Sequence, residues 1–137
     1  MAIAGGHVAV LLNRMRLFDL APLLAGKLVV AWSAGAMAVS ERIVLFHDSP
    51  PQGPGNPEVF DAGLGLCTGV LPLPHADRRL RLEDPVRVDL FARRFSPSIC
   101  AILDPGARWD WDGTGWTAGP GTRRLLRHGR VREMGHS

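Results

Sequence analysis

The sequence predicts an α/β domain with a largely parallel sheet. Segments whose apolar residues have helical spacing alternate with short apolar runs, which is the pattern of such domains. The run "LVVAW" (28–32) is continuous rather than alternating, as expected of a strand buried on both faces of a parallel sheet. A chain of 137 residues, 46% of them hydrophobic and 21% charged, fits one domain (1–137) with a real core and excludes a disordered chain.

The first third of the chain predicts two helices, a strand and a third helix. Apolar residues three and four positions apart favour an amphipathic helix from about 7 to 17. Asp19 is a candidate cap for a second, short helix that ends at Gly26. The strand 28–32 follows, and "SAGAMAVSE" (33–41) favours a helix directly after it.

The middle of the chain predicts a strand, a long loop and a second strand. The run "RIVLF" (42–46) is typical of a strand. The segment 47–63 holds four prolines and three glycines, which predicts a loop. "GVLPLPHA" (69–76) is interpreted as the end of a strand leading into a loop, since its two prolines restrict their neighbours.

The last third predicts a helix, a strand and hairpins. Asp84 as cap and Pro85 at the first helical position favour a helix over 84–95. "ICAILD" (99–104) is a β-rich run that ends at a Pro-Gly turn. Asp-Gly, Gly-Pro-Gly and His-Gly turn signals divide 104–134 into short runs, which predicts a C-terminal hairpin region.

Charge and cysteine content indicate the class of protein and its compartment. The net charge is +3, and the densest basic cluster, 123–133, alternates with apolar residues. We interpret it as a solvated hairpin face and not as a nucleic-acid surface. Cys67 and Cys100 suit buried positions in a reduced, cytoplasmic protein. No signal peptide and no run of about 18 apolar residues is present, which predicts no membrane partner.

Ser33 lies where the run 28–32 meets the small residues Ala34, Gly35 and Ala36. A serine at a sharp strand-to-helix turn can act as a nucleophile, because the turn exposes its hydroxyl and backbone N–H groups can stabilise an oxyanion. Ala31 replaces the first glycine of the G-x-S-x-G form of this turn. Serine is also a favoured helix cap. The turn alone leaves both interpretations open.

Three pieces of sequence in order are more specific than the turn alone. They are "AGGHVAVLL" near the N-terminus, "WSAGA" around Ser33, and "DAGLGLCTGVLPLPHADRRLRL" downstream. This combination, over about residues 3 to 110, resembles the aspartyl dipeptidase (peptidase E) and cyanophycinase family of serine peptidases. The resemblance implies a class I glutamine amidotransferase-like (flavodoxin-like) fold with three layers and a mostly parallel sheet.

The resemblance also implies a site. Ser33 is the expected nucleophile and His75, in "PHADRR", the expected general base. The backbone N–H of Ala34, together with one from Gly5 or Gly6, is the expected oxyanion hole. The reaction would be hydrolysis of a peptide or isopeptide bond through an acyl-enzyme.

Two carboxylates are candidates for the group that orients His75. Asp48, in "FHDSP", matches one position that the family uses. Asp104, in "LDPG", lies one residue from a second position, which Pro105 occupies. The choice between them stays open. His7 is a further difference, since the family often has asparagine after the two glycines.

The family's substrates imply what this site binds. Members accept dipeptides that begin with aspartate or aspartate-rich polymers, so we expect a small, aspartate-containing peptide. Arg78, Arg79 and Arg81 are candidates for binding its carboxylate, and surface arginines at a helix start are the alternative. We expect no cofactor and no metal, because no third or fourth ligand stands at a suitable spacing.

Family members carry further strands and helices before the Gly-Gly turn. The resemblance therefore implies that this chain is a partial domain whose sheet exposes an edge, which favours pairing and leaves a homodimer open. It also leaves open a second function, that of a catalytically inactive interaction module.

Overall fold

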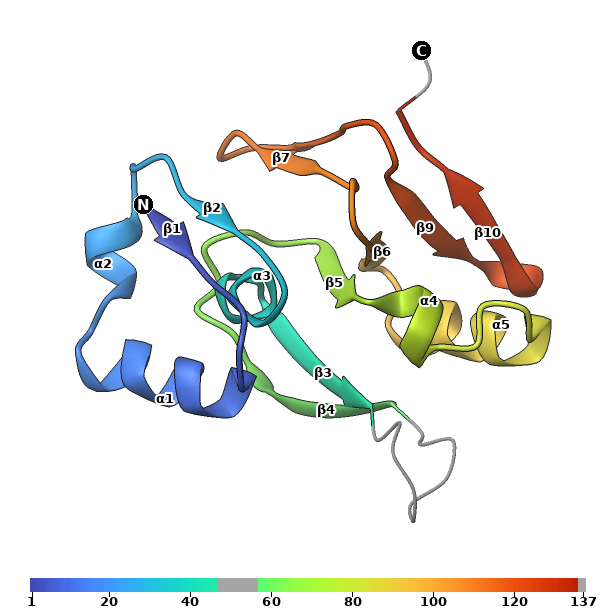
Figure 1. Cartoon of the computed structure of the whole chain (residues 1–137), viewed down its shortest axis with the longest axis horizontal. Helices are drawn as coiled ribbons and strands as arrows, with labels where there is room; N and C mark the ends of the chain where they lie inside the picture. Colours follow the sequence, from blue (N-terminus) through green and yellow to red (C-terminus); the bar gives the residue numbers. More distant parts are fainter. Residues whose placement is uncertain (47–56, 136–137) are drawn as a thin grey trace.

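The computed structural model, which describes residues 1–46 and 57–135, is a mixed α/β structure built on small sheets. The helices are α1 (Val8–Leu17), α2 (Ala21–Leu24), α3 (Ala34–Val39), α4 (Ala76–Arg79) and α5 (Pro85–Arg94), with a 3-10 turn η1 (Arg127–Gly129). The strands are β1 (Ala2–Ile3), β2 (Val30–Ala31), β3 (Arg42–Phe46), β4 (Pro57–Ala62), β5 (Val70–Pro74), β6 (Ile99–Leu103), β7 (Trp109–Trp111), β8 (Trp116–Ala118), β9 (Arg123–Leu126) and β10 (Arg130–Glu133). β1, β2, α1 and α2 lie at one end of the molecule, and β9, β10 and α5 lie at the other (Figure 1).

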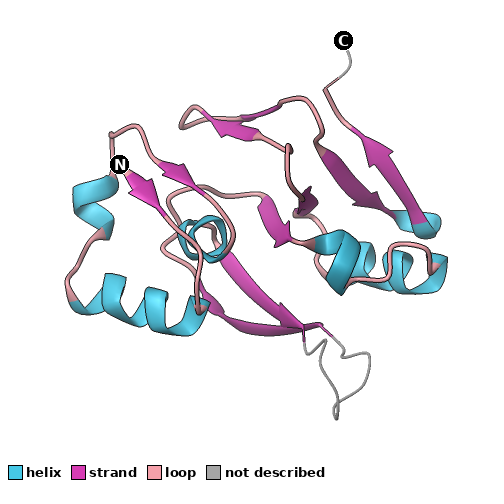
Figure 2. Ribbon diagram, viewed as in Figure 1, coloured by secondary structure: helices cyan, strands magenta, loops and turns pink. Residues whose placement is uncertain are grey.

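The strands form short, separate groups (Figure 2). A four-stranded sheet has the order β10-β9-β6-β5, in which only β5 and β6 are parallel. β1 and β2 form a second parallel pair, while β3–β4 and β7–β8 are antiparallel hairpins.

The expected three-layer, amidotransferase-like fold with a mostly parallel sheet is therefore wrong. The two parallel pairs belong to different sheets, and within the described ranges no extended parallel sheet joins them. β1 and β2 are only two residues long. After β6 the chain returns through β9, which pairs antiparallel with β6 and then turns back into β10. The turn-rich tail thus completes the sheet with antiparallel strands.

Helix α5 covers one face of the four-stranded sheet. Asp84 caps it, since its Oδ1 accepts hydrogen bonds from the N–H groups of Val86 and Arg87 at 3.0 and 3.2 Å. The helix buries one row of side chains against the sheet. These side chains belong to the largest hydrophobic cluster in the described core. Its buried members are Val44, Leu71, Leu73, Ala76, Leu80, Val88, Phe91, Phe95, Cys100, Ile102 and Leu125.

Two smaller clusters hold the N-terminal half together. The first packs α1 on α3 and β3 through Val8, Leu12, Ala34, Met37 and Ile43. The second surrounds β1 and contains Ile3, Met15, Leu24 and Ala38. An ion pair between Arg16 of α1 and Asp61 of β4, 2.7 Å from Nη1 to Oδ2, ties the helix to that hairpin. These contacts position the turn that follows β2.

Several predicted elements are confirmed. They are the helices near 7–17, 33–41 and 84–95, the strands at 42–46 and 99–104, and the C-terminal hairpins. The strand predicted within 69–76 is confirmed as β5, whereas the loop expected after it is wrong, because the short helix α4 begins at Ala76.

Three further predictions of local structure are wrong. Only Val30–Ala31 of the run 28–32 is a strand, and it is not buried on both faces, since Leu28 is 84% and Val30 56% exposed. Asp19 does not cap α2, which begins after Leu20 without a side-chain cap. Part of the loop expected over 47–63 is strand β4, because 57–62 pair with β3.

Both cysteines are buried and unpaired, as expected for small apolar side chains. Burial raises the pKa of Cys67 from 9.0 to about 11 and that of Cys100 to about 12. None of the described helices is long and apolar enough to cross a membrane.

The thiols predict how stability depends on pH. The native state holds both thiols protonated, whereas an unfolded chain ionises them near pH 9. The contribution of the two protonated thiols to the free energy of unfolding is complete below pH 9. It is lost as the pH rises towards 11 and 12. We expect the free energy of unfolding in urea to fall over this range, and less steeply in a Cys67→Ala, Cys100→Ala double variant. Equal slopes for the two proteins would contradict the assignment.

Candidate active site

Ser33 joins β2 to α3 in a strained backbone conformation. Its φ and ψ are 51° and −125°, a region that residues with a side chain rarely adopt. Its side chain is half-buried and makes no cap hydrogen bond to α3. The helix-cap interpretation of Ser33 therefore lacks the hydrogen bond that defines such a cap.

Two glycines let the β1 segment approach this turn closely. The N–H of Trp32 donates to the carbonyl of Ile3 at 3.2 Å, which continues the β1–β2 pairing up to the serine. A Cβ on Gly35 would collide with the Ile3 carbonyl oxygen. A Cβ on Gly5 would lie 2.9 Å from Cβ and 3.1 Å from Oγ of Ser33. Neither position has room for a side chain.

Of the residues expected to form the oxyanion hole, Gly5 approaches the Ser33 hydroxyl. The Cβ position of Gly5, which lies 3.1 Å from Oγ, is 4.0 Å from the backbone nitrogen of Ala34. Gly6 follows with a φ of 135°, which glycine adopts readily. The structure thus places Gly5 close to Ser33 and Ala34.

His75 directly follows strand β5. Its φ and ψ of 57° and 37° are left-handed, and its side chain is exposed. Its carbonyl accepts the N–H groups of Arg78 and Arg79 at 3.1 Å, which starts α4. Helix α3 packs beside β5, yet among the described residues no hydrogen bond joins Ser33 to His75.

Asp104 lies beside His75 because β5 and β6 are parallel and in register. Pro74 is paired with Leu103, so the two site residues follow neighbouring strand ends. Both line a hollow of about 230 Å³, together with Asp77, Arg78 and Pro105.

The carboxylate of Asp104 is held by Arg123 of β9. Arg123 Nη2 donates to Asp104 Oδ2 at 2.7 Å and to Asp77 Oδ2 at 2.9 Å. The N–H of Asp77 reaches Asp104 Oδ1 at 3.4 Å. Burial, and then the hydrogen bond with the Asp77 side chain, raise the pKa of Asp104, while the charge of Arg123 opposes the rise.

The other expected site residues have less defined places. Arg78 lines the hollow with His75. Arg81 lies outside it and approaches Glu83, with 3.7 Å from Nε to Oε1, while Arg79 is half-buried at the end of α4. Asp48 lies outside the described residues.

Nothing in the sequence marks Arg123 as a site residue. It belongs to a charge-rich hairpin strand, and its partner Asp77 lies 46 positions earlier in the chain. Only the pairing of β9 with β6, in which Arg123 faces Ile102, brings the guanidinium to Asp104.

Comparison with protein-family models, curated proteins and solved structures finds no match to this chain. In the part of the chain that the structure describes, no group of three or more His, Cys, Asp or Glu side chains could hold a metal ion.

The close approach of Gly5 to Ser33 predicts a coupling between the two positions. Gly5→Ala should lower the free energy of unfolding by about 1–3 kcal/mol, because its methyl group overlaps Ser33. In a Ser33→Gly background, which removes both overlapped atoms, most of this loss should vanish. A double-mutant cycle in urea measures the coupling.

Gly115→Ala is the matched control. No atom lies within 4 Å of the Cβ position of Gly115, so its change should stay within about 0.5 kcal/mol. Additive effects of Gly5→Ala and Ser33→Gly would show that the two residues do not meet.

Proposed function

We propose that this protein is a serine-type hydrolase that cleaves a peptide or isopeptide bond through an acyl-enzyme on Ser33. The observation that carries this proposal is the backbone of Ser33. A half-buried serine with φ 51° and ψ −125°, without a cap bond and enclosed by Gly5, resembles a nucleophile held at a strained turn. A helix cap needs none of these features.

His75 is the proposed general base. It takes the Oγ proton of Ser33 as Oγ attacks the carbonyl carbon, and it then returns that proton to the leaving amine as the C–N bond breaks. Water, deprotonated by the same imidazole, then attacks the ester carbonyl carbon, and the imidazole returns the proton to Ser33 Oγ as the C–Oγ bond breaks. His75 is exposed at the end of β5, and such hydrogen bonds often tighten only when substrate is bound.

The N–H groups of Ala34 and of Gly5 or Gly6 are the proposed oxyanion donors. The supporting observation is the closeness of Gly5 to both the hydroxyl and the nitrogen of Ala34. Backbone donors fixed before the reaction stabilise the developing charge without reorganising.

Asp104 is the proposed partner of His75, and Asp48 is the alternative. Asp104 lines the same hollow as His75 and follows the neighbouring strand. Arg123 fixes its carboxylate from the side of β9. In this arrangement Asp104 would orient the imidazole once His75 turns towards Ser33.

The proposed substrate is a small peptide that contains aspartate. Arg78 is the proposed carboxylate ligand, because it lines the hollow beside His75 whereas Arg81 is engaged near Glu83. The resemblance of the sequence around Ser33 and His75 to aspartyl dipeptidases and cyanophycinases supports this choice of substrate.

A second candidate function is an interaction module without catalytic activity. The observation that favours it is the exposure of apolar side chains in β2 and in the residues on either side of it. Leu28 is 84%, Val30 56% and Trp32 50% exposed. Large exposed apolar patches mark interaction sites. Reactivity of Ser33 separates the two candidates.

A fluorophosphonate probe tests the enzymatic proposal. We expect the Ser33 hydroxyl to displace fluoride from the probe, so that the folded protein gains one phosphonyl group. Peptide mapping should locate this group on Ser33. Ser33→Ala should abolish labelling, and His75→Ala should slow it by about 10²-fold or more, with partial rescue by added imidazole. Labelling is followed by intact-mass measurement.

Thr117→Val is the control for loss of an unrelated hydroxyl, since Thr117 lies on the exposed side of β8. It should label at the rate of the unmodified protein. A folded protein that shows no labelling, or labelling that survives Ser33→Ala, would exclude the proposed nucleophile and leave the interaction module.

A further inference from the structure

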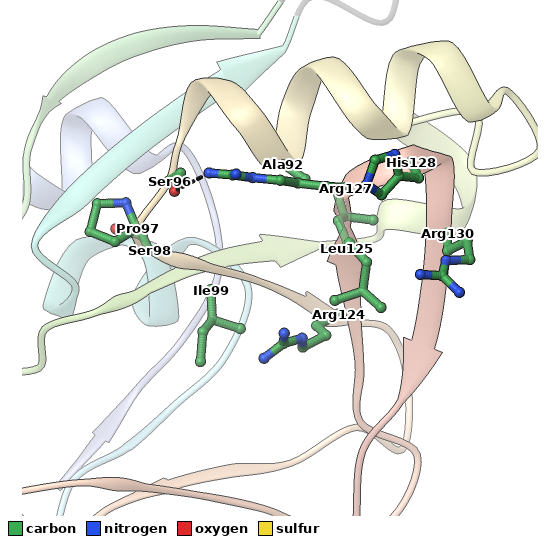
Figure 3. Close-up of a pocket in the computed structure, with 11 residues that line it drawn as sticks. Ala92, Ser96, Pro97, Ser98, Ile99, Arg124, Leu125, Arg127, His128 and Arg130 are labelled. Atoms are coloured by element: carbon green, nitrogen blue, oxygen red, sulfur yellow. Dashed lines mark hydrogen bonds between the residues drawn. The ribbon is translucent and has the colours of Figure 1, made fainter.

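A second pocket lies at the opposite end of β6 from His75 and Asp104. Among the described residues, β9 pairs with β6 only at Arg124–Ala101 and Arg123–Ile102, so the ladder includes neither the start of β6 nor the end of β9. The space between them, about 400 Å³, has a volume in the range of small-molecule sites. Residues 96–99, at the start of β6, line one side, and the end of β9 with η1 lines the other (Figure 3).

The lining of this pocket is cationic. Arg124, Arg127, Arg130 and His128 line it, and none of the lining residues is Asp or Glu. Arg124 and Arg127 both extend from the β9 side towards the 96–99 segment (Figure 3). We call this site the arginine pocket.

The arginines of the pocket have no carboxylate partners in the described ranges. Arg127 Nη2 donates to the neutral hydroxyl of Ser96 at 3.1 Å. The Nε of Arg124 is fully enclosed and has no hydrogen-bond partner among the described residues. Asp89 belongs to α5, which also contributes Ala92 to the lining. Its carboxylate accepts hydrogen bonds from Arg93 Nε at 2.7 Å and from the backbone N–H of His128.

The register of the hairpin adds a further unbalanced charge. Arg124 stands directly opposite Arg132 in the β9–β10 ladder, so two like charges share one face. Like charges at such positions destabilise a sheet, and the enclosed Nε of Arg124, which has no partner among the described residues, adds a desolvation cost. An anion bound in the pocket would balance the charge of Arg124, which lines it, whereas Arg132 does not.

We propose that the arginine pocket binds the phosphoryl group of a small organic phosphate. Guanidinium groups hold phosphate oxygens through paired hydrogen bonds, and the hydroxyls of Ser96 and Ser98 offer neutral donors in the same lining. Ala92, Ile99 and Leu125 provide an apolar surface for the organic part. Nucleic acid would instead need a basic track along an extended surface, whereas Arg124, Arg127 and Arg130 line one hollow.

The test is a titration of the full chain, labelled with ¹⁵N, with phenyl phosphate and with inorganic phosphate at constant ionic strength. We expect saturable shifts of the backbone amides of 96, 98 and 125–130, with phenyl phosphate bound more tightly because of the apolar lining. Arg124→Gln should raise the dissociation constant about tenfold or more. Arg132→Gln is the matched control, because Arg132 shares the ladder position but does not line the pocket, and it should change the constant less than about twofold.

Three results would overturn the proposal. They are the absence of saturable shifts, an equal loss of binding in Arg132→Gln, and tighter binding of a single-stranded oligothymidylate than of phenyl phosphate. The last would assign the surface to nucleic acid. If Arg124→Gln does not fold, Arg127→Gln replaces it, and a rise of the melting temperature of the unmodified protein with phenyl phosphate, but not with sodium chloride, supplies a readout that needs no variant.

Discussion

The close approach of the β1 segment to the turn after β2 is the constraint on which the candidate site depends. The Ile3 carbonyl occupies the space that a side chain at Gly35 would need, and the Ser33 side chain occupies the space that one at Gly5 would need. With the β1–β2 pairing continued by the Trp32 N–H, this contact holds Ser33 at a positive φ, a conformation that would otherwise relax. The two small clusters around α1, α3 and β1 hold the segments that make the contact.

A separate constraint places the other half of the site. β5 and β6 are the only parallel pair in the four-stranded sheet among the described residues, so their ends bring His75 and Asp104 to one hollow. β9 then adds Arg123 from the antiparallel side. The arginine pocket lies at the other end of β6, where β9 and β6 are not paired. One irregular sheet therefore offers a carboxylate–histidine site and a cationic site at its two ends.

The sequence predicts elements whose signals are local and misses those that distant partners decide. Asp84 and Pro85 begin α5 by capping chemistry, and the spacing around Leu12 fixes α1. The run 28–32 has the apolar composition of a buried parallel strand. Burial depends on neighbouring strands, however, and Leu28 is exposed. The direction of β9 depends on its pairing with Ile102, which no local pattern encodes. For the site, the small residues around Ser33 predict the turn, whereas Arg123 is found only through tertiary contacts.

The proposed mechanism forms an acyl-enzyme on Ser33. Rapid mixing of the protein with a p-nitrophenyl ester measures this step directly, because acylation releases nitrophenol before slower deacylation. We expect an initial burst that approaches one equivalent of nitrophenol per chain, with the acyl group recovered on Ser33 after acid quenching. A folded protein that gives no burst, or that carries the acyl group on another residue, would contradict it.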